Sequence, residues 1–335
     1  MNRSAQPKFL FQPYGEFNRS ERGEVSGFDV PTRFHSIPGP KDLSIEQHWE
    51  SWIEGMIKEL NEVLWPSWLP DNQTWSRSAA HSNMLALTQA DFYLLEQMEM
   101  ASSRRGLDSY PASPALAFDS YDHFSMFAIE DDRTRPRAKE KEAFASFYRM
   151  YDRTLPPDIA NLVPDYLVGF IGECLGNLSH RTKAQLQRPR PYQTALTITK
   201  KVFHYEEGRT AATPSACSGH CLQGLSAVAA IFESIIKRAI PFNTVNSQCL
   251  QQFAVDIGDR RVMAGIHYPS DNLCSWLILL RLADRIYAYP EVKRWIWTAI
   301  SNRSRVYEFI EKASKTTDGA VYLPILKRLK AASKA

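Results

Sequence analysis

The sequence lacks the features that define several large classes of protein. Its longest uncharged and largely apolar runs, 221–232 and 272–280, are well short of the ~20 residues that span a bilayer, and the N-terminus has no apolar core of a secretory signal. The formal charge of +3 shows no excess of one sign suited to nucleic acid or an anionic membrane surface. We therefore expect a soluble, cytoplasmic protein with no membrane span and no nucleic-acid partner.

Cysteine is scarce, and the spacing typical of metal ligands is missing. The five cysteines are odd in number and scattered, which argues against a disulfide framework and for a reducing compartment. No group of histidine, cysteine or carboxylate residues has metal-ligand spacing. We expect neither disulfides nor a metal site.

Strand signals and internal repeats are also lacking, whereas helical periodicity is abundant. The longest alternation typical of a strand is 195–205, and no repeat of a solenoid occurs. Apolar residues at helical spacing predict helices over 44–65, 81–100, 139–155, 165–183, 220–240, 244–267 and 269–289. The expected fold class is all-α, a helical bundle.

A change of composition divides the chain near residue 140. The region 102–142 is rich in turn-forming residues and ends in the charged run 131–142, which is typical of a solvated loop. We expect an N-terminal helical portion, 1–140, that packs on a helical bundle, 141–335. The aromatic residues of the N-terminal portion favour one integrated domain.

Three segments of the bundle carry groups suited to an oxyanion. In the first, Lys183, Arg188 and Arg190 supply three cations, and prolines stiffen the backbone around the arginines. Arginine offers a planar fork that matches two phosphate oxygens, and lysine adds a compact charge. Taken alone, this segment is more typical of a solvated basic loop.

The second segment places Ser218, Gly219 and His220 just ahead of an apolar helix. Backbone N–H groups and the helix dipole favour an anion at such a terminus, and glycine allows a ligand to approach the backbone closely. His220 then lies where it could give a proton to a leaving oxygen. A serine N-cap beside an unrelated histidine is the alternative.

The third segment contains Arg261, His267 and Asp271. Proline is favoured at the first position of a helix, so Pro269 predicts a helix start with His267 in the connection before it. Asp271 then lies in the first turn, where its carboxylate can bond one imidazole nitrogen and leave the other free as a nucleophile.

In this order the three segments resemble the signature of the type-2 phosphatidic acid phosphatase and vanadium haloperoxidase superfamily, which includes bacterial acid phosphatases. The match covers 183–271, and elsewhere only the all-helical architecture is similar. Two positions depart from the usual pattern: Cys217 stands where proline is common, and Arg260 stands where serine is common.

The resemblance implies a metal-independent phosphatase without a cofactor. His267 would attack phosphorus to form a phosphohistidine, Asp271 would orient His267, and His220 would protonate the leaving group and later activate water. The equatorial oxygens would be held by Lys183, Arg190, Ser218, Gly219 and Arg261. The substrate would be a phosphate monoester, either of a lipid or isoprenoid alcohol or of a soluble sugar or nucleotide. The apolar helices are also compatible with a homodimer.

Two alternatives remain open at this point. A vanadium-dependent haloperoxidase would hold vanadate in the same pocket, with His267 as its ligand, and oxidise halide with hydrogen peroxide. Members of that branch surround the cofactor with aromatic residues, whereas this chain has polar residues at His180 and Thr213, and Tyr192 and Gln193 follow Arg190-Pro191. This lining favours hydrolysis. The other alternative is a protein that binds an anion without catalysis.

Four further side chains lie near the motifs in the sequence, and for these we predict only whether they are exposed or buried. Arg188 and Arg260 are expected on the surface, the alternative being selection of a more highly charged substrate. Cys217 and Cys221 are expected to be small buried thiols.

Overall fold

The structure is a computed structural model, and it describes residues 55–56, 58–60, 86–98, 175, 178–179, 182–183, 188, 190–191, 194, 215–242, 244–263 and 265–334. These residues are predominantly helical, and no strand occurs among them. The expected all-α class is therefore confirmed. The helix predicted over 139–155 and the boundary near residue 140 lie outside the described residues.

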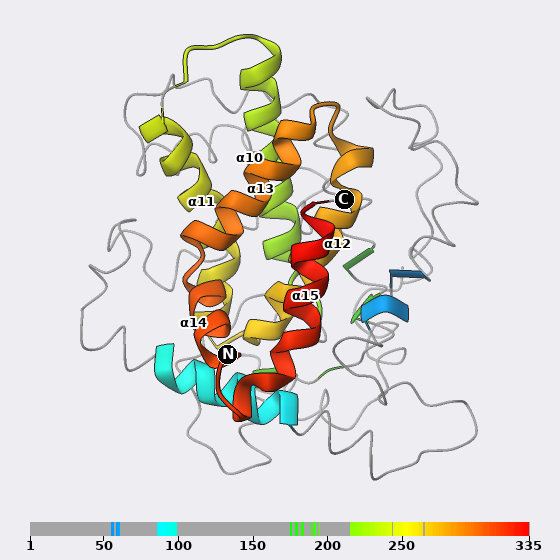
Figure 1. The fold of residues 1–335 in the computed structure, drawn as a ribbon, viewed down its shortest axis with the longest axis vertical. Helices are drawn as coiled ribbons and strands as arrows, with labels where there is room; N and C mark the ends of the chain where they lie inside the picture. The colour runs from blue at the N-terminus through cyan, green and yellow to red at the C-terminus, as the bar shows by residue number, and fades with distance from the viewer. Residues whose placement is uncertain are drawn as a thin grey trace, which may run out of the picture.

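The C-terminal part of the chain is a bundle of consecutive helices (Figure 1). In chain order these are α10 (Gly219–Lys237), α11 (Thr244–Met263), α12 (Pro269–Ile286), α13 (Pro290–Arg303), α14 (Arg305–Ala313), the 3-10 helix η8 (Asp318–Tyr322) and α15 (Leu323–Ala332). Helix α10 packs against α11 and α12, α12 packs against α15, and α13 contacts both α11 and α12. The residues described from the predicted helices 44–65 and 81–100 are also helical.

Helix α10 is nearly apolar all round and mostly buried, as expected for a helix at the centre of a bundle. Its N-cap is Ser218, whose hydroxyl accepts the Cys221 N–H at 3.3 Å. By length and composition α10 is also the one helix among the described residues that could cross a membrane. However, 83% of its most apolar window is buried within the protein, as in the core helix of a bundle.

Two glycines allow α10 and α11 to approach closely. A Cβ atom on Gly258 would lie 2.6 Å from the Cys221 sulfur and 3.2 Å from the Cys221 Cα, and one on Gly224 would lie 2.5 Å from Ile257 Cγ2. Because residue 221 faces 258 and residue 224 faces 257, the two helices are antiparallel. The C-terminal end of α11 therefore lies beside the N-terminal end of α10.

Helices α10 and α12 run in the same direction. Near their start the Ser275 hydroxyl donates to the Ser218 carbonyl at 2.8 Å, and further along the Tyr287 hydroxyl donates to the Ser226 carbonyl at 2.8 Å. Their N-termini consequently lie together at one end of the bundle, next to the C-terminus of α11.

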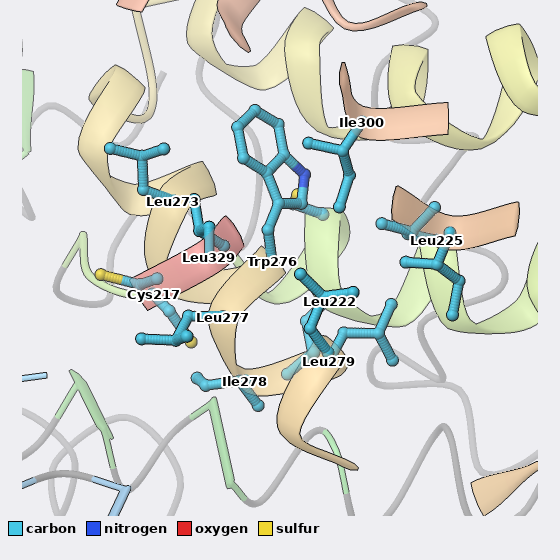
Figure 2. Packing of buried hydrophobic residues seen from close by; sticks show 14 of the residues in the cluster. Cys217, Leu222, Leu225, Leu273, Trp276, Leu277, Ile278, Leu279, Ile300 and Leu329 are labelled. Atoms are coloured by element: carbon cyan, nitrogen blue, oxygen red, sulfur yellow. The ribbon is translucent and has the colours of Figure 1, made fainter. Parts of the chain in front are cut away.

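The hydrophobic core joins these helices around Trp276 of α12. Figure 2 shows its indole among side chains of several helices, which include Leu222 of α10, Ile300 of α13 and Leu329 of α15. Trp276 is buried and packs at a tilt against Tyr307 of α14, with 6.1 Å between ring centroids. This packing fixes the orientation of α12, whose first turn carries part of the site.

The close contact at Gly258 gives a testable prediction. Gly258→Ala should lower the free energy of unfolding by about 1–3 kcal/mol, because the new methyl group collides with Cys221 backbone as well as side chain. The matched control is Gly55→Ala, in an exposed helical position where a Cβ meets nothing within 4 Å, and it should raise stability by about 0.5–1 kcal/mol. Urea denaturation of both variants measures the difference, and a Gly258→Ala protein as stable as the parent would contradict the packing described.

Candidate active site

The connection between α11 and α12 presents His267 at the end of the bundle where α10 and α12 begin. Gly265 has φ of 68°, a left-handed conformation that glycine adopts without strain. The N–H groups of Ile266 and His267 both donate to the Arg261 carbonyl at 3.2 Å, which caps α11. Helix α12 then begins at Pro269, as the sequence predicted.

The Asp271 carboxylate reaches back from the first turn of α12 to His267. The distance between His267 Nδ1 and Asp271 Oδ2 is 3.0 Å, and the same oxygen accepts the Tyr268 N–H at 2.9 Å and the Ser215 hydroxyl. Asp271 is fully buried. The pair predicted from the four-residue spacing is therefore present, held by backbone as well as side chains.

Arg190 contacts the other nitrogen of the same imidazole. Its Nη1 lies 3.0 Å from His267 Nε2 and donates to the Ile266 carbonyl at 3.0 Å. A guanidinium group can only donate hydrogen bonds, so Nε2 must be the acceptor. The ring proton is therefore on Nδ1, where it donates to Asp271, and Nε2 carries the lone pair.

The charge state of His267 agrees with this tautomer. Burial lowers the pKa of His267 well below its ordinary 6.5, and the charge of Arg190 lowers it further. The hydrogen bond to Asp271 acts in the opposite direction without reversing the shift. His267 is thus a neutral imidazole at neutral pH.

Asp271 is an ionised carboxylate in spite of its burial. Burial by itself raises the pKa of Asp271, but the charge of Arg188 and the hydrogen bond from His267 outweigh it, so the pKa lies below the ordinary 3.8. A negative charge on Asp271 can accordingly stabilise positive charge that develops on the His267 ring.

His220 lies among the same cations. Burial lowers the pKa of His220 well below 6.5, and the positive charges of Arg261, Lys183 and Arg190 lower it further. The structure thus brings the predicted residues of all three segments into one electrostatic neighbourhood. Each of these side chains is almost completely buried, with an exposed fraction no greater than 5%. A concentration of buried positive charge favours binding of an anion.

Ser218 and Gly219 lie at the start of α10, beside this cluster. The Ser218 hydroxyl caps the helix, and the Ser218 N–H points to the Asp271 carbonyl at 3.4 Å. A Cβ on Gly219 would lie 3.0 Å from the Ser179 hydroxyl oxygen. The use of these two amides for an oxyanion stays a prediction.

Two expectations about neighbouring side chains were wrong. Arg188 and Arg260 are not surface residues, since their exposed fractions are 1% and 5%. Arg188 forms ion pairs with Asp91 at 2.7 Å and with Asp271 at 3.0 Å, and Arg260 faces Asp256 at 4.0 Å. Each arginine faces a buried carboxylate, one helical turn away for Arg260 and far away in the sequence for Arg188.

The cysteines beside the site behave as expected. Cys217 and Cys221 are buried free thiols, and burial raises the pKa of each. The four residues that separate the haloperoxidase alternative from hydrolysis, His180, Tyr192, Gln193 and Thr213, lie outside the described residues.

Sequence reasoning missed the contribution of Asp91, Ser270 and Tyr322. Asp91 lies in the helical segment 86–98, where the buried positions Leu87, Ala90, Leu94 and Met98 form an apolar face. An apolar helix face is an unusual position for an aspartate. This signal in the sequence would have indicated that Asp91 has a buried partner.

Comparison with protein families agrees with this geometry. The family model of the PAP2 superfamily matches residues 166–295, a range that contains all eight site residues proposed from the sequence. The match is consistent with a member of the PAP2 superfamily, and it supports a phosphatase-type activity in general. Searches of curated proteins and of solved structures found no significant match.

The assigned tautomer predicts a nuclear magnetic resonance spectrum. Since the pKa of His267 and of His220 lies well below 6.5, neither ring should titrate near that ordinary value, and His267 should carry its proton on Nδ1. Nitrogen–proton correlation spectra of the imidazole rings test this, with His267→Gln and His220→Gln to assign the signals. A His267 ring that titrates at 6.5 or above, or that is protonated on Nε2, would contradict the described site.

Proposed function

We propose that the chain is a metal-independent phosphatase that hydrolyses phosphate monoesters through a phosphohistidine on His267. The observation that carries this proposal is the fixed state of the imidazole, with Nδ1–H bonded to Asp271 and the Nε2 lone pair turned to Arg190. A neutral nitrogen held next to a cation is suited to attack an anionic phosphorus centre, because the cation draws the substrate to it.

In the first step, the Nε2 lone pair forms a bond to phosphorus while the ester P–O bond breaks. His220 donates its proton to the departing alkoxide, and Asp271 stabilises the positive phosphoimidazole through Nδ1–H. In the second step, His220 removes a proton from water, the water oxygen attacks phosphorus, and the P–N bond breaks. Phosphate leaves, and His267 is neutral again.

The protonation of His220 depends on the substrate in this mechanism. In the free protein the neighbouring cations, together with burial, lower its pKa. A phosphate dianion in the same place supplies negative charge that opposes those cations and raises the pKa of His220 in the complex. The acid would therefore be charged when a substrate is present to receive its proton.

Lys183, Arg190 and Arg261 would supply the charge neutralisation that metal ions give in other phosphatases. Among the described residues, no three histidine, cysteine or carboxylate side chains are grouped as a metal site would require. Independence from metal is part of the proposal and is tested by activity after treatment with a chelator.

Vanadate would fit the same side chains, because it is a tetrahedral oxyanion of similar charge. His267 Nε2 would be its ligand, and Lys183, Arg190 and Arg261 would hold its oxygens. Bound vanadate supplies peroxide activation in haloperoxidases. We propose hydrolysis in preference, with a lipid, isoprenoid or soluble phosphate monoester as substrate.

Replacing the nucleophile tests the proposed function directly. His267→Ala should lower the turnover of p-nitrophenyl phosphate by roughly a thousandfold or more while the circular dichroism spectrum is unchanged. His220→Ala should still form a phosphoenzyme with this substrate, because its acidic leaving group needs little protonation, and should hydrolyse that intermediate slowly. Retention of about a tenth of the activity in His267→Ala would refute the assignment.

Vanadate with peroxide distinguishes the two chemistries. Orthovanadate should inhibit the phosphatase in competition with substrate, because it occupies the site of the transferred phosphoryl group. Addition of bromide and hydrogen peroxide to the vanadate-loaded protein should leave a phenolic dye unbrominated. Rapid bromination, lost in His267→Ala, would instead favour the haloperoxidase.

A further inference from the structure

The buried carboxylate of Asp91 joins parts of the chain outside the family match to the site. It belongs to the helical segment 86–98 and is completely buried. Its Oδ1 accepts the Ser270 N–H at 3.2 Å and the Tyr322 hydroxyl at 2.7 Å. Its Oδ2 accepts Arg188 Nη2 at 2.7 Å and the Ser270 hydroxyl at 2.5 Å. Four donors therefore hold the carboxylate in one orientation.

Arg188 connects this carboxylate to Asp271. While Nη2 bonds Asp91, Nη1 donates to Asp271 Oδ1 at 3.0 Å and to the Ser270 hydroxyl at 2.6 Å. The guanidinium group lies over the ring of Tyr268, 3.7 Å from its centroid, and Phe92 packs edge-on against that ring. The plane of the arginine fork is thus fixed by two carboxylates and an aromatic ring.

We propose that Asp91 and Tyr322 are positioning residues for His267, acting through Arg188 and Ser270 on the Asp271 carboxylate. The proposal rests on the proposed function of His267 as nucleophile. Neither residue touches the imidazole, and both lie outside 166–295, the part of the chain that matches the PAP2 superfamily.

The first physical reason is the start of α12. Its N-cap residue, Tyr268, makes no side-chain cap hydrogen bond. Asp91 supplies the missing acceptor by bonding the Ser270 N–H in the first turn, where the helix dipole also favours negative charge. Asp91 thereby holds the turn that carries Asp271.

The second reason is the division of the charge on Arg188. Burial raises the pKa of Asp91, whereas Arg188 and the hydrogen bonds from Ser270 and Tyr322 act in the opposite direction and favour the charged form. When Asp91 is charged, one arm of the guanidinium is neutralised and the other donates to Oδ1 of Asp271, while Oδ2 accepts from His267. Without that negative charge, the positive charge of Arg188 would act on Asp271 alone. The carboxylate would then be a weaker acceptor for the Nδ1–H of His267.

Loss of this network should lower the turnover number more than it weakens substrate binding. The network reaches His267 only at Nδ1, through Asp271. Substrate binding is assigned to other side chains, namely Lys183, Arg190 and Arg261. Asp91→Asn should lower kcat about tenfold, in line with the loss of an outer partner of a functional side chain, and change KM little. The His267 Nδ1–H signal should move upfield, because its hydrogen bond to Asp271 weakens.

Tyr322→Phe is the decisive variant, because loss of a buried charge partner in Asp91→Asn could prevent folding. Its matched control is Tyr287→Phe, which also removes one buried phenol hydrogen bond, from Tyr287 to the Ser226 carbonyl at 2.8 Å, near the far end of α12. Tyr322→Phe should lower kcat by roughly threefold and shift the Nδ1–H signal, whereas Tyr287→Phe should change neither. Both should lower thermal stability to a similar extent.

The outcomes separate this inference from the proposed function. If Tyr322→Phe and Tyr287→Phe have the same effect on kcat and on the Nδ1–H signal, the residues are merely structural and the inference fails. If His267→Ala stays active while Tyr322→Phe still shifts the signal, the positioning network stands and the phosphohistidine mechanism is wrong. The signal can be recorded without any substrate, so it decides the inference even if p-nitrophenyl phosphate is not hydrolysed.

Discussion

The buried charge of Asp271 determines how this end of the bundle is arranged. A carboxylate without water is costly unless donors surround it, and Asp271 draws them from His267, from the Tyr268 backbone, from Ser215 and from Arg188. The donors come from separate stretches of the chain. Because these donors converge on one ionised group, the His267 imidazole, the start of α12 and the segments that carry Arg188 and Ser215 are held in fixed positions relative to one another.

The helix directions complete the arrangement. Because α10 and α12 are parallel, both direct N-terminal dipoles toward the same place, and antiparallel α11 brings Arg261 to that end. Helix N-termini and buried cations both favour negative charge. The bundle therefore offers a positive, largely dehydrated environment around two neutral imidazoles, which is suited to a tetrahedral oxyanion.

The same buried cations affect both the binding of an anion and the protonation of the two histidines. The positive charges that attract an anion also keep His220 and His267 neutral in the free protein. In the proposed mechanism, a bound anion offsets those charges and raises the pKa of His220, the residue that would donate the proton. His267 differs because the ionised Asp271 accepts its Nδ1–H, so that the lone pair stays on Nε2, where it accepts from Arg190 in the free protein.

The sequence alone determined the features that depend on residues close to one another along the chain. The helix start at Pro269 and the bond from His267 to Asp271 were predictable, because one helical turn sets the geometry of residues four positions apart. The apolar pattern of α10 likewise predicted a central helix. The burial of Arg188 was not predictable from its basic, proline-containing segment, which is typical of a solvated loop. Only the tertiary structure brings Arg188 to Asp91, 97 residues away, and to Asp271. A long-range ion pair depends on how whole helices pack, and no local spacing encodes that packing.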